Sequence, residues 1–419
     1  MGYMEKFTKI KNAYRFIYHG VDLSRVMIFE MYDCALGRCV WDWRSMFLEY
    51  DLSSLSIGDK MPVLSTFGRQ NRKDHKEVYD YVYERIKDIS AYNDLNELQI
   101  TRTFHPLRSL GVVIRSMWAL KGCKVISFMF KLRFSFRACV YCNSLCELER
   151  LDLSGVKRYL SMYHVDQLEN MITQYMKLKG IPTYSLCEGI YVVDKENLTI
   201  DSVNYTNFET DKLLVWGQYV VDAFKKEGIP EKKMVVCGYP HKVIPAAMNG
   251  GNTFKRCVVL LARRDFSHSN FALLDILKVF SDRYEFNLKL HPNCERQPIE
   301  DFAQKNRMSL VPSEKTVGQC IDGVSFDWAI AVNTSAYYEA LMRGVPCLRF
   351  CDGTFKMMPG CNDMFSDKKS FVDTLCVMQS DIRSGEYQKH VDEMLHYAVG
   401  LGIDRYGEEV RNGLMETQK

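Results

Sequence analysis

Short apolar runs alternate with amphipathic segments through most of the second half of the chain. Apolar runs bounded by turn residues are typical of buried strands, whereas apolar positions three and four apart indicate helices. The strands predicted in this way are Arg256–Ala262, Phe286–Leu290, Met308–Val311, Trp328–Val332 and Pro346–Phe350. The helices predicted between them are Phe271–Tyr284, Ile299–Asn306 and Ser335–Arg343. Strands that alternate with helices in this way predict a doubly wound parallel sheet.

The middle of the chain repeats the alternation. Its predicted strands are Arg158–Tyr163, Tyr184–Leu186, Leu213–Trp216 and Met234–Cys237, and one helix is predicted at Asp166–Lys179. The polar stretch Asn249-Gly250-Gly251-Asn252 follows, and Gly-Gly between polar residues is typical of a hinge. We therefore predict an N-terminal, acceptor-side domain (residues 1–245), a C-terminal, nucleotide-binding domain (residues 253–385) and a helical tail (residues 386–419).

The predicted fold class is α/β, with two Rossmann-like doubly wound domains that face each other across a cleft. In open parallel sheets, ligands bind beyond the carboxyl ends of the strands. Three groups of polar residues follow predicted strands directly: Glu188-Gly189, His291-Pro292 and Asn333-Thr334-Ser335. We expect them to meet in the cleft.

Glu188 interrupts an apolar stretch that is predicted to resume as a strand at Ile190–Val193. An unpaired charge in such surroundings is costly, so this carboxylate either pairs with a lysine or arginine or performs chemistry. Desolvation is expected to raise its pKa, which suits a general base that works near neutral pH. Gly189 permits a sharp turn or the close approach of a ligand to the backbone.

His291 follows a predicted strand, and Pro292 ends that strand. A histidine in this position can donate a hydrogen bond to a phosphate or protonate a leaving group, or it can simply be solvated. A second His-Pro pair begins at His105, but it follows a less apolar run, and we assign it no function.

Thr334 and Ser335 stand where a strand passes into a helix. Hydroxyl side chains there can cap the helix, and the same backbone N–H groups bind phosphate. Glu339 lies one turn further along. It either accepts hydrogen bonds from ribose hydroxyls or interacts favourably with the helix dipole.

The segments KGIPTYSLCEGIYV, DKLLVWGQYV, KMVVCGYP, FNLKLHPN and VNTSAYYEALMRGVPCL occur in this order over about residues 158–350. In this they resemble bacterial glycosyltransferases of the GT-B fold that build capsules, lipopolysaccharide and wall polymers. That group includes polysialyltransferases, Kdo transferases and CDP-glycerol polymerases. The resemblance implies that Glu188 is the general base, and that His291, Pro292, Thr334 and Ser335 hold the donor's phosphate. Cys187 is a departure, because polysialyltransferase-like members have an acid at that position.

The resemblance implies a metal-independent transfer of a sugar, with inversion, from a nucleotide donor to a hydroxyl group of a surface glycan or a lipid-linked acceptor. A CMP-linked acidic sugar such as sialic acid or Kdo is the first expectation, and a UDP-sugar or a CDP-polyol is the alternative. A nucleotide-sugar epimerase and a non-catalytic nucleotide-binding protein are alternatives of other classes. No cofactor or metal is expected, and the sequence contains no Asp-x-Asp triplet of the kind that holds one in other transferases.

The composition limits the partners and the cellular compartment that can be expected for this protein. The net charge of +3 is too small to indicate a nucleic-acid partner. The 15 scattered cysteines are typical of free thiols in a reducing cytoplasm. No apolar run approaches the ~18 residues that span a bilayer. Peripheral attachment to the inner face of the plasma membrane is nevertheless expected from Lys121–Arg137, which carries five positive charges, no acids and interleaved phenylalanines.

Within that basic segment, phenylalanines and basic residues largely alternate over Phe128–Arg137. This period is closer to that of a strand than to that of a helix. An amphipathic strand or loop with a solvated basic face is the alternative to membrane contact. Nearby, Cys139, Cys142 and Cys146 have metal-like spacing but lack a second ligand pair, so core thiols are the preferred interpretation.

Overall fold

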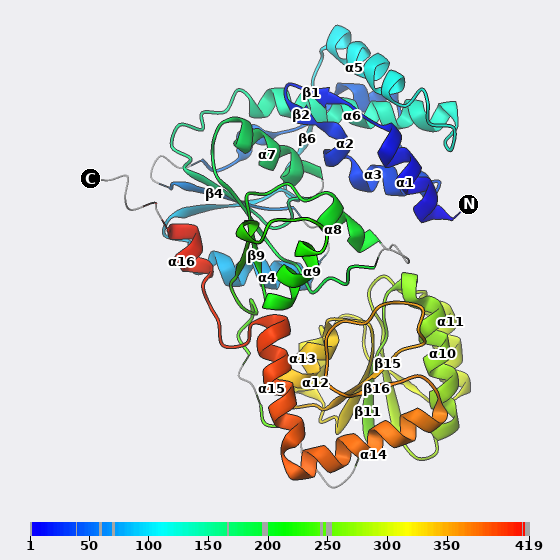
Figure 1. The fold of residues 1–419 in the computed structure, drawn as a ribbon. Coiled ribbons are helices and arrows are strands. Elements are labelled where there is room, and N and C mark those ends of the chain that lie inside the picture. The colour runs from blue at the N-terminus through cyan, green and yellow to red at the C-terminus, as the bar shows by residue number, and fades with distance from the viewer. Residues whose placement is uncertain are drawn as a thin grey trace.

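The computed structural model describes residues 2–38, 40–57, 61–68, 72–165, 167–194, 200–243, 246–248, 254–412 and 414. The predicted hinge at 249–252 lies outside these residues, as does the first residue of the helix predicted at Asp166–Lys179. Two parallel sheets form the centres of two lobes, one above the other in Figure 1.

The N-terminal lobe contains a six-stranded sheet in the order β10-β9-β8-β7-β4-β5, in which every neighbouring pair is parallel. Its strands are β4 (Val63–Phe67), β5 (Ser90–Asp94), β7 (Arg158–Ser161), β8 (Thr183–Leu186), β9 (Lys212–Val215) and β10 (Met234–Val236). The helices between them are α4 (Lys73–Tyr83), α7 (Gln167–Leu178), α8 (Val203–Thr206) and α9 (Gln218–Lys225), with short 3-10 turns η3 (Ile200–Ser202) and η4 (Glu231–Lys233). The strands predicted in the middle of the chain are confirmed, but Ile190–Val193 is wrong, because that segment leaves the sheet and lines a cavity instead.

The C-terminal lobe contains a second six-stranded parallel sheet, in the order β13-β12-β11-β14-β15-β16. Its strands are β11 (Arg256–Leu260), β12 (Glu285–Lys289), β13 (Ser309–Leu310), β14 (Trp328–Val332), β15 (Cys347–Phe350) and β16 (Met364–Phe365). The accompanying helices are α10 (Ser267–Leu277), α11 (Arg296–Lys305), α12 (Val317–Gly323) and α13 (Ala336–Met342), with η5 (Arg264–Phe266) and η6 (Lys278–Phe280). All five residues of β14 are buried, as expected for a central parallel strand.

Both sheets have the same topological feature. The chain moves outward from β11 to β13 and then returns to β14 on the other side of β11. In the N-terminal sheet, the corresponding reversal lies between β4 and β7. Ligands bind at such points, just beyond the carboxyl ends of the strands. The architecture is thus the predicted one, two Rossmann-like α/β lobes in the GT-B arrangement.

A helical layer made by the first part of the chain covers the N-terminal lobe at its outer end (Figure 1). It consists of α1 (Tyr3–Ala13), α2 (Leu23–Val26), α3 (Ile28–Ala35), α5 (Pro106–Ala119) and α6 (Phe128–Leu148), with η1 (Trp43–Phe47) and η2 (Leu52–Ser54). Two small antiparallel sheets accompany these helices, β1 (Ile17–Tyr18) with β2 (Val21–Asp22) and β3 (Leu48–Tyr50) with β6 (Ile100–Arg102).

The strand-like interpretation of Phe128–Arg137 is wrong, because this segment begins the long helix α6. Ser127 caps the helix by accepting a hydrogen bond from the backbone N–H of Phe130 at 3.3 Å. The helix lies beneath α5 and is buried on several sides, so its apolar residues do not follow a single stripe. Arg137, part of the basic segment expected to contact a membrane, is buried, and its Nε lies 3.1 Å from Oε1 of Glu30.

The end of the chain returns to the N-terminal lobe. Helices α14 (Lys368–Ser384) and α15 (Glu386–Val399) lie against the C-terminal lobe, whereas α16 (Tyr406–Arg411) lies against the N-terminal one (Figure 1). The Tyr406 hydroxyl donates to the carbonyl of Gly238 at 2.7 Å, which ties the crossing segment to the end of β10. No helix among the described residues is both long and apolar enough to cross a bilayer.

Candidate active site

Two adjoining cavities lie between the lobes at the carboxyl ends of the two sheets. Cavity 1 has a volume of about 250 Å³ and is bounded by aromatic side chains of the N-terminal lobe, among them Tyr163, Tyr191 and Tyr205. Cavity 2 has a volume of about 400 Å³ and extends over the C-terminal lobe. The residues that line both cavities are Arg72, Glu188, His291, Thr334 and Ser335. The three strand-end groups predicted from the sequence therefore meet at one place.

Glu188 follows the end of β8 and has a side chain that is only 11% exposed. Its Oε2 lies 3.2 Å from Nδ1 of His75, whose side chain is 4% exposed. An imidazole is thus one partner of this carboxylate. Gly189 lines cavity 1, and a Cβ atom built there would meet nothing within 4 Å, so the glycine leaves this part of the cavity open.

Cys187 fixes the loop that presents Glu188. Its thiol donates a hydrogen bond to the carbonyl of Gly189 at 2.9 Å. Burial raises the pKa of Cys187 to about 12, so the thiol keeps its proton at neutral pH and remains a donor. An acid at this position accepts hydrogen bonds when ionised and cannot make this contact, which gives the departure from the polysialyltransferase-like pattern a structural reason.

His75 was not predicted from the sequence. It lies in the first turn of α4, after β4, which is buried along its whole length. The rule that identified the other groups, polar residues beyond the carboxyl end of a buried strand, applies to β4 as well. The part of the sequence that contains β4 shows no clear alternation of strands and helices, so nothing there marked β4 as a strand of the sheet.

His291 lies just beyond β12, and its ring orientation is fixed locally. The backbone N–H of Asn293 donates to Nδ1 of His291 at 3.0 Å. Burial, with the positive charges of Arg72 and Arg263 nearby, lowers the pKa of His291 to about 4, since both effects disfavour the charged imidazolium. The imidazole is therefore neutral at pH 7 with its proton on Nε2, which can donate to an anionic group. Pro292 lines cavity 2 beside it.

The turn after β14 has an unusual backbone. Asn333 adopts a left-handed conformation, with φ of 30°. Such a backbone is rare outside glycine and is found at functional sites. The Asn333 side chain holds the facing loop by donating to the Lys356 carbonyl at 3.0 Å and accepting from the Met358 N–H at 3.3 Å. Ser335 makes no side-chain capping bond to α13, whereas the Thr334 hydroxyl accepts a hydrogen bond from the backbone N–H of Ala336 at 3.4 Å. The cap alternative therefore applies to Thr334 and not to Ser335.

Glu339 lies on α13 and lines cavity 2. Burial raises the pKa of this carboxyl to about 7, against the opposing effect of the nearby Arg343 guanidinium. Its carboxylate accepts a hydrogen bond from the backbone N–H of Gly318 at the start of α12. The ribose and helix-dipole interpretations of Glu339 both remain predictions.

Three further polar residues that follow strands divide between the cleft and the core. Arg263 lines cavity 1 and is paired with Asp201 at 2.6 Å, and His241 lines cavity 2. His164 is buried against Phe208 and lines neither cavity. His105 is exposed at the start of α5, in keeping with its exclusion.

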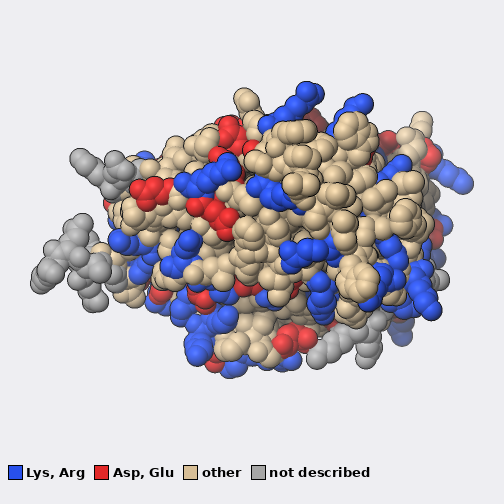
Figure 2. All heavy atoms as spheres, turned by 90° about the horizontal axis from the view of Figure 1, so that it is seen from above, with Lys and Arg blue, Asp and Glu red and all other residues tan. Residues whose placement is uncertain are grey.

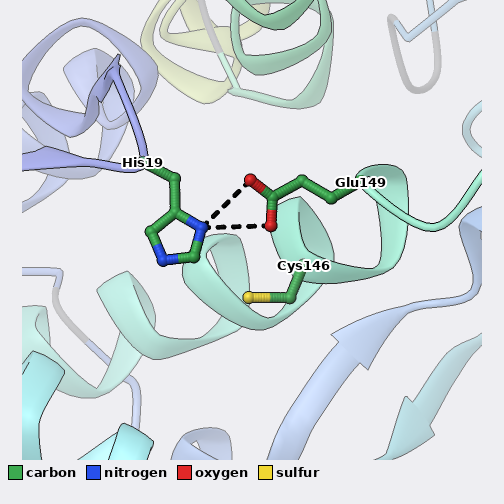
Figure 3. A group of neighbouring side chains, drawn as sticks. All are labelled: His19, Cys146 and Glu149. Atoms are coloured by element: carbon green, nitrogen blue, oxygen red, sulfur yellow. Dashed lines mark hydrogen bonds and ion pairs between the residues drawn. The ribbon is translucent and has the colours of Figure 1, made fainter.

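One group of potential metal ligands lies away from the cleft. His19, on the turn between β1 and β2, places Nδ1 3.0 Å from both carboxylate oxygens of Glu149, and Cys146 lies beside them on α6 (Figure 3). None of the three lines either cavity. Cys139 and Cys142 are buried in α6, as expected for core thiols.

No family model matches the chain, and no curated protein matches it. Solved structures similar to this chain include the apo form of the lipopolysaccharide outer core galactosyltransferase WaaB, with 13% identity, 85% of this chain and 99% of that chain covered, and a TM-score of 0.47. The UDP-GlcNAc 2-epimerase from Neisseria meningitidis bound to UDP-GlcNAc has 14% identity, coverage of 85% and 100%, and a TM-score of 0.43. S. aureus MnaA with UDP has 12% identity, coverage of 85% and 96%, and a TM-score of 0.48. Likeness at these levels says nothing about the roles of individual residues.

Proposed function

We propose that this protein is a metal-independent glycosyltransferase that moves a sugar, with inversion, from a nucleotide donor to a hydroxyl group. The observation that supports this most directly is the meeting of Glu188, His291, Thr334 and Ser335 between two adjoining cavities. Cavity 2, which extends over the C-terminal lobe, suits the nucleotide, and cavity 1 suits the acceptor. An epimerase needs room for the nucleotide sugar alone, so the second cavity favours a transferase.

Glu188 is the general base in this proposal. Its carboxylate takes the proton of the acceptor hydroxyl as the oxygen attacks the anomeric carbon. The bond between that carbon and the donor phosphate oxygen breaks, and its electron pair leaves with the nucleotide. His75, 3.2 Å away, is a positioning residue that holds the carboxylate toward cavity 1.

The departing phosphate gains negative charge, and two kinds of donor stabilise it. The Nε2–H of His291 supplies one hydrogen bond, and the hydroxyls of Thr334 and Ser335 supply others. Donors already oriented before the reaction typically contribute several kcal/mol to such a step. Because the pKa of His291 is about 4, the ring is a neutral imidazole at pH 7, and its Nε2–H acts as a hydrogen-bond donor and not as a general acid.

The donor expected first is a CMP-linked acidic sugar, and a UDP-sugar or a CDP-polyol is the alternative. The acceptor is a surface glycan or a lipid-linked precursor of one. Every cysteine that the structure describes is a free thiol, in keeping with a reaction in the reducing cytoplasm.

A thermal-shift screen with CMP, CDP, UDP and GDP tests the nucleotide site, because a ligand that binds only the folded state raises the melting temperature. We expect one base to stabilise the protein clearly, and stabilisation by none of them would refute the site. The responding nucleotide sugar is then incubated without acceptor. Interconversion into an epimer, detected by NMR, would replace the transferase proposal with an epimerase.

Glu188→Gln tests the base, because the amide keeps the shape of the side chain but cannot take a proton. We expect nucleotide binding to persist and transfer to fall by about 10²- to 10⁴-fold. Glu386→Gln, at an exposed position outside both cavities, is the matched control. Normal turnover by Glu188→Gln would show that the base is another residue.

His75→Gln tests the positioning role through the pH dependence of the rate. If His75 orients and ion-pairs with the base, its replacement shifts the acidic limb of the pH–rate profile. His105→Gln, at an exposed histidine outside both cavities, should leave the profile unchanged. A lower rate with an unaltered profile would mean that His75 serves the fold only.

A further inference from the structure

Helix α5 is apolar on two opposite sides. One side is buried against the layer below and includes Val112 and Val113. The other carries four large apolar side chains with high exposed fractions: Leu107 (85%), Leu110 (52%), Ile114 (59%) and Trp118 (68%). Their spacing of three and four residues places them in one stripe. A water-facing helix surface of this kind is typical of an interaction site.

The apolar surface extends beyond α5. Phe104, just before the helix, is 79% exposed. Phe128 and Met129, in the first turn of α6, are 68% and 53% exposed. The stripe on α5 together with Phe104, Phe128 and Met129 is called the α5 face below. Phe134 and Arg137, which the sequence had included in a basic, aromatic surface segment, are buried and do not belong to it.

The charges around the α5 face have one sign. Residues 98–146 contain no aspartate or glutamate, and they contain eight lysines and arginines. Those with exposed side chains are Arg102, Arg115, Lys121, Lys124 and Arg133. The Lys121 ammonium lies 3.7 Å from the centre of the Trp118 ring. Charge and apolar surface are therefore directly adjacent, and the cation is attracted to the face of the indole.

The position of α5 makes the surface accessible. The helix lies at the outer end of the N-terminal lobe, opposite the C-terminal lobe (Figure 1). Seen from that end, uncharged and basic side chains dominate the middle and right of the face, and acidic ones gather mainly on the left (Figure 2). A flat partner can therefore reach α5 without meeting the other lobe.

We propose that the α5 face docks the protein on an anionic lipid bilayer, with the apolar stripe in the headgroup region and the surrounding lysines and arginines on acidic headgroups. Helices that lie in a membrane interface combine these two features, and tryptophan favours that region. Two copies of the chain that met through this face would bring their basic residues together, which is unfavourable. The docking is independent of the reaction proposed for the cleft.

Vesicle co-sedimentation of the full chain tests the proposal. We expect binding to phosphatidylcholine vesicles that contain about a third phosphatidylglycerol, and little binding to pure phosphatidylcholine. Because a basic residue near such a surface contributes about 1 kcal/mol, Lys121→Gln and Lys124→Gln should each weaken binding about fivefold at low salt. High salt should weaken vesicle binding by the wild type toward the level shown by a variant that combines Lys121→Gln with Lys124→Gln.

The apolar component is tested with Leu107→Ala combined with Trp118→Ala, for which we expect at least about a tenfold loss of binding. Val279→Ala with Val377→Ala is the control, because these apolar side chains are exposed too (54% and 50%) but lie on the other lobe. An unchanged melting temperature excludes misfolding. Absence of binding to anionic vesicles, or equal loss in the control, would overturn the proposal. A concentration-dependent dimer abolished by the same pair, without vesicle binding, would assign the face to a second copy.

Discussion

Glu339 offers a quantitative test of the electrostatics of the cleft. Burial raises the pKa of its carboxyl from about 4.5 to about 7, with the carboxylates of Asp74 and Glu77 across the cleft acting in the same direction. The folded protein thus holds a proton on Glu339 over a pH range in which the unfolded chain has released it. Folding stability must then fall as the pH rises through this range.

The magnitude follows from the two pKa values. One pKa unit corresponds to about 1.4 kcal/mol. The interval from 4.5 to about 7 therefore corresponds to up to about 3 kcal/mol. Glu339→Gln removes the titration while keeping an oxygen that can accept from the Gly318 N–H. Below about pH 4.5, the variant and the wild type should have similar stability, because both side chains are neutral. Above about pH 7.5, the variant should be more stable by up to about 3 kcal/mol.

Urea unfolding at constant ionic strength, measured at intervals from pH 4.5 to pH 8, gives the free energy of unfolding of each protein. Glu314→Gln is the control, because Glu314 lines the same cavity but is exposed. A stability difference between Glu339→Gln and the wild type that does not change with pH would refute the inference that burial raises the pKa of Glu339 to about 7.

Three further measurements test other parts of the structure. In NMR spectra, the imidazole of His291 should remain neutral, with the proton on Nε2, from pH 8 to about pH 5, and should titrate near pH 4; a midpoint near the ordinary value of about 6.5 would contradict its burial. Asp363→Asn leaves the buried Arg349, 2.7 Å from the carboxylate in the wild type, without its counter-charge. This change should cost about 3–5 kcal/mol of stability by urea unfolding, so a cost below about 1 kcal/mol would contradict the pairing. Gly238→Ala should destabilise the protein more than Gly228→Ala, because both glycines have positive φ but only the Cβ at 238 would collide with backbone, 1.8 Å from the nearest atom. Similar melting temperatures for the two variants would refute this, since the left-handed backbone alone costs both alanines alike.

Local sequence determined the elements around the cleft. The burial of a parallel strand on both faces produces a continuous apolar run, which is why β12 and β14 were found close to their true limits. The residue after such a run must lie at the carboxyl edge of the sheet, so Glu188, His291 and Ser335 could be placed there without coordinates. Even the tautomer of His291 depends on a donor only two residues away.

Tertiary packing decided the rest. The imidazole nearest Glu188 belongs to His75, from a distant part of the chain, and no local pattern links the two. Phe128–Arg137 alternates like a strand but is a helix, because burial on several sides removes the single apolar stripe that identifies a helix in a sequence. The exposed stripe of α5 has the same cause. The spacing of apolar residues in a sequence predicts an apolar helix face, but only tertiary packing decides whether another element covers that face.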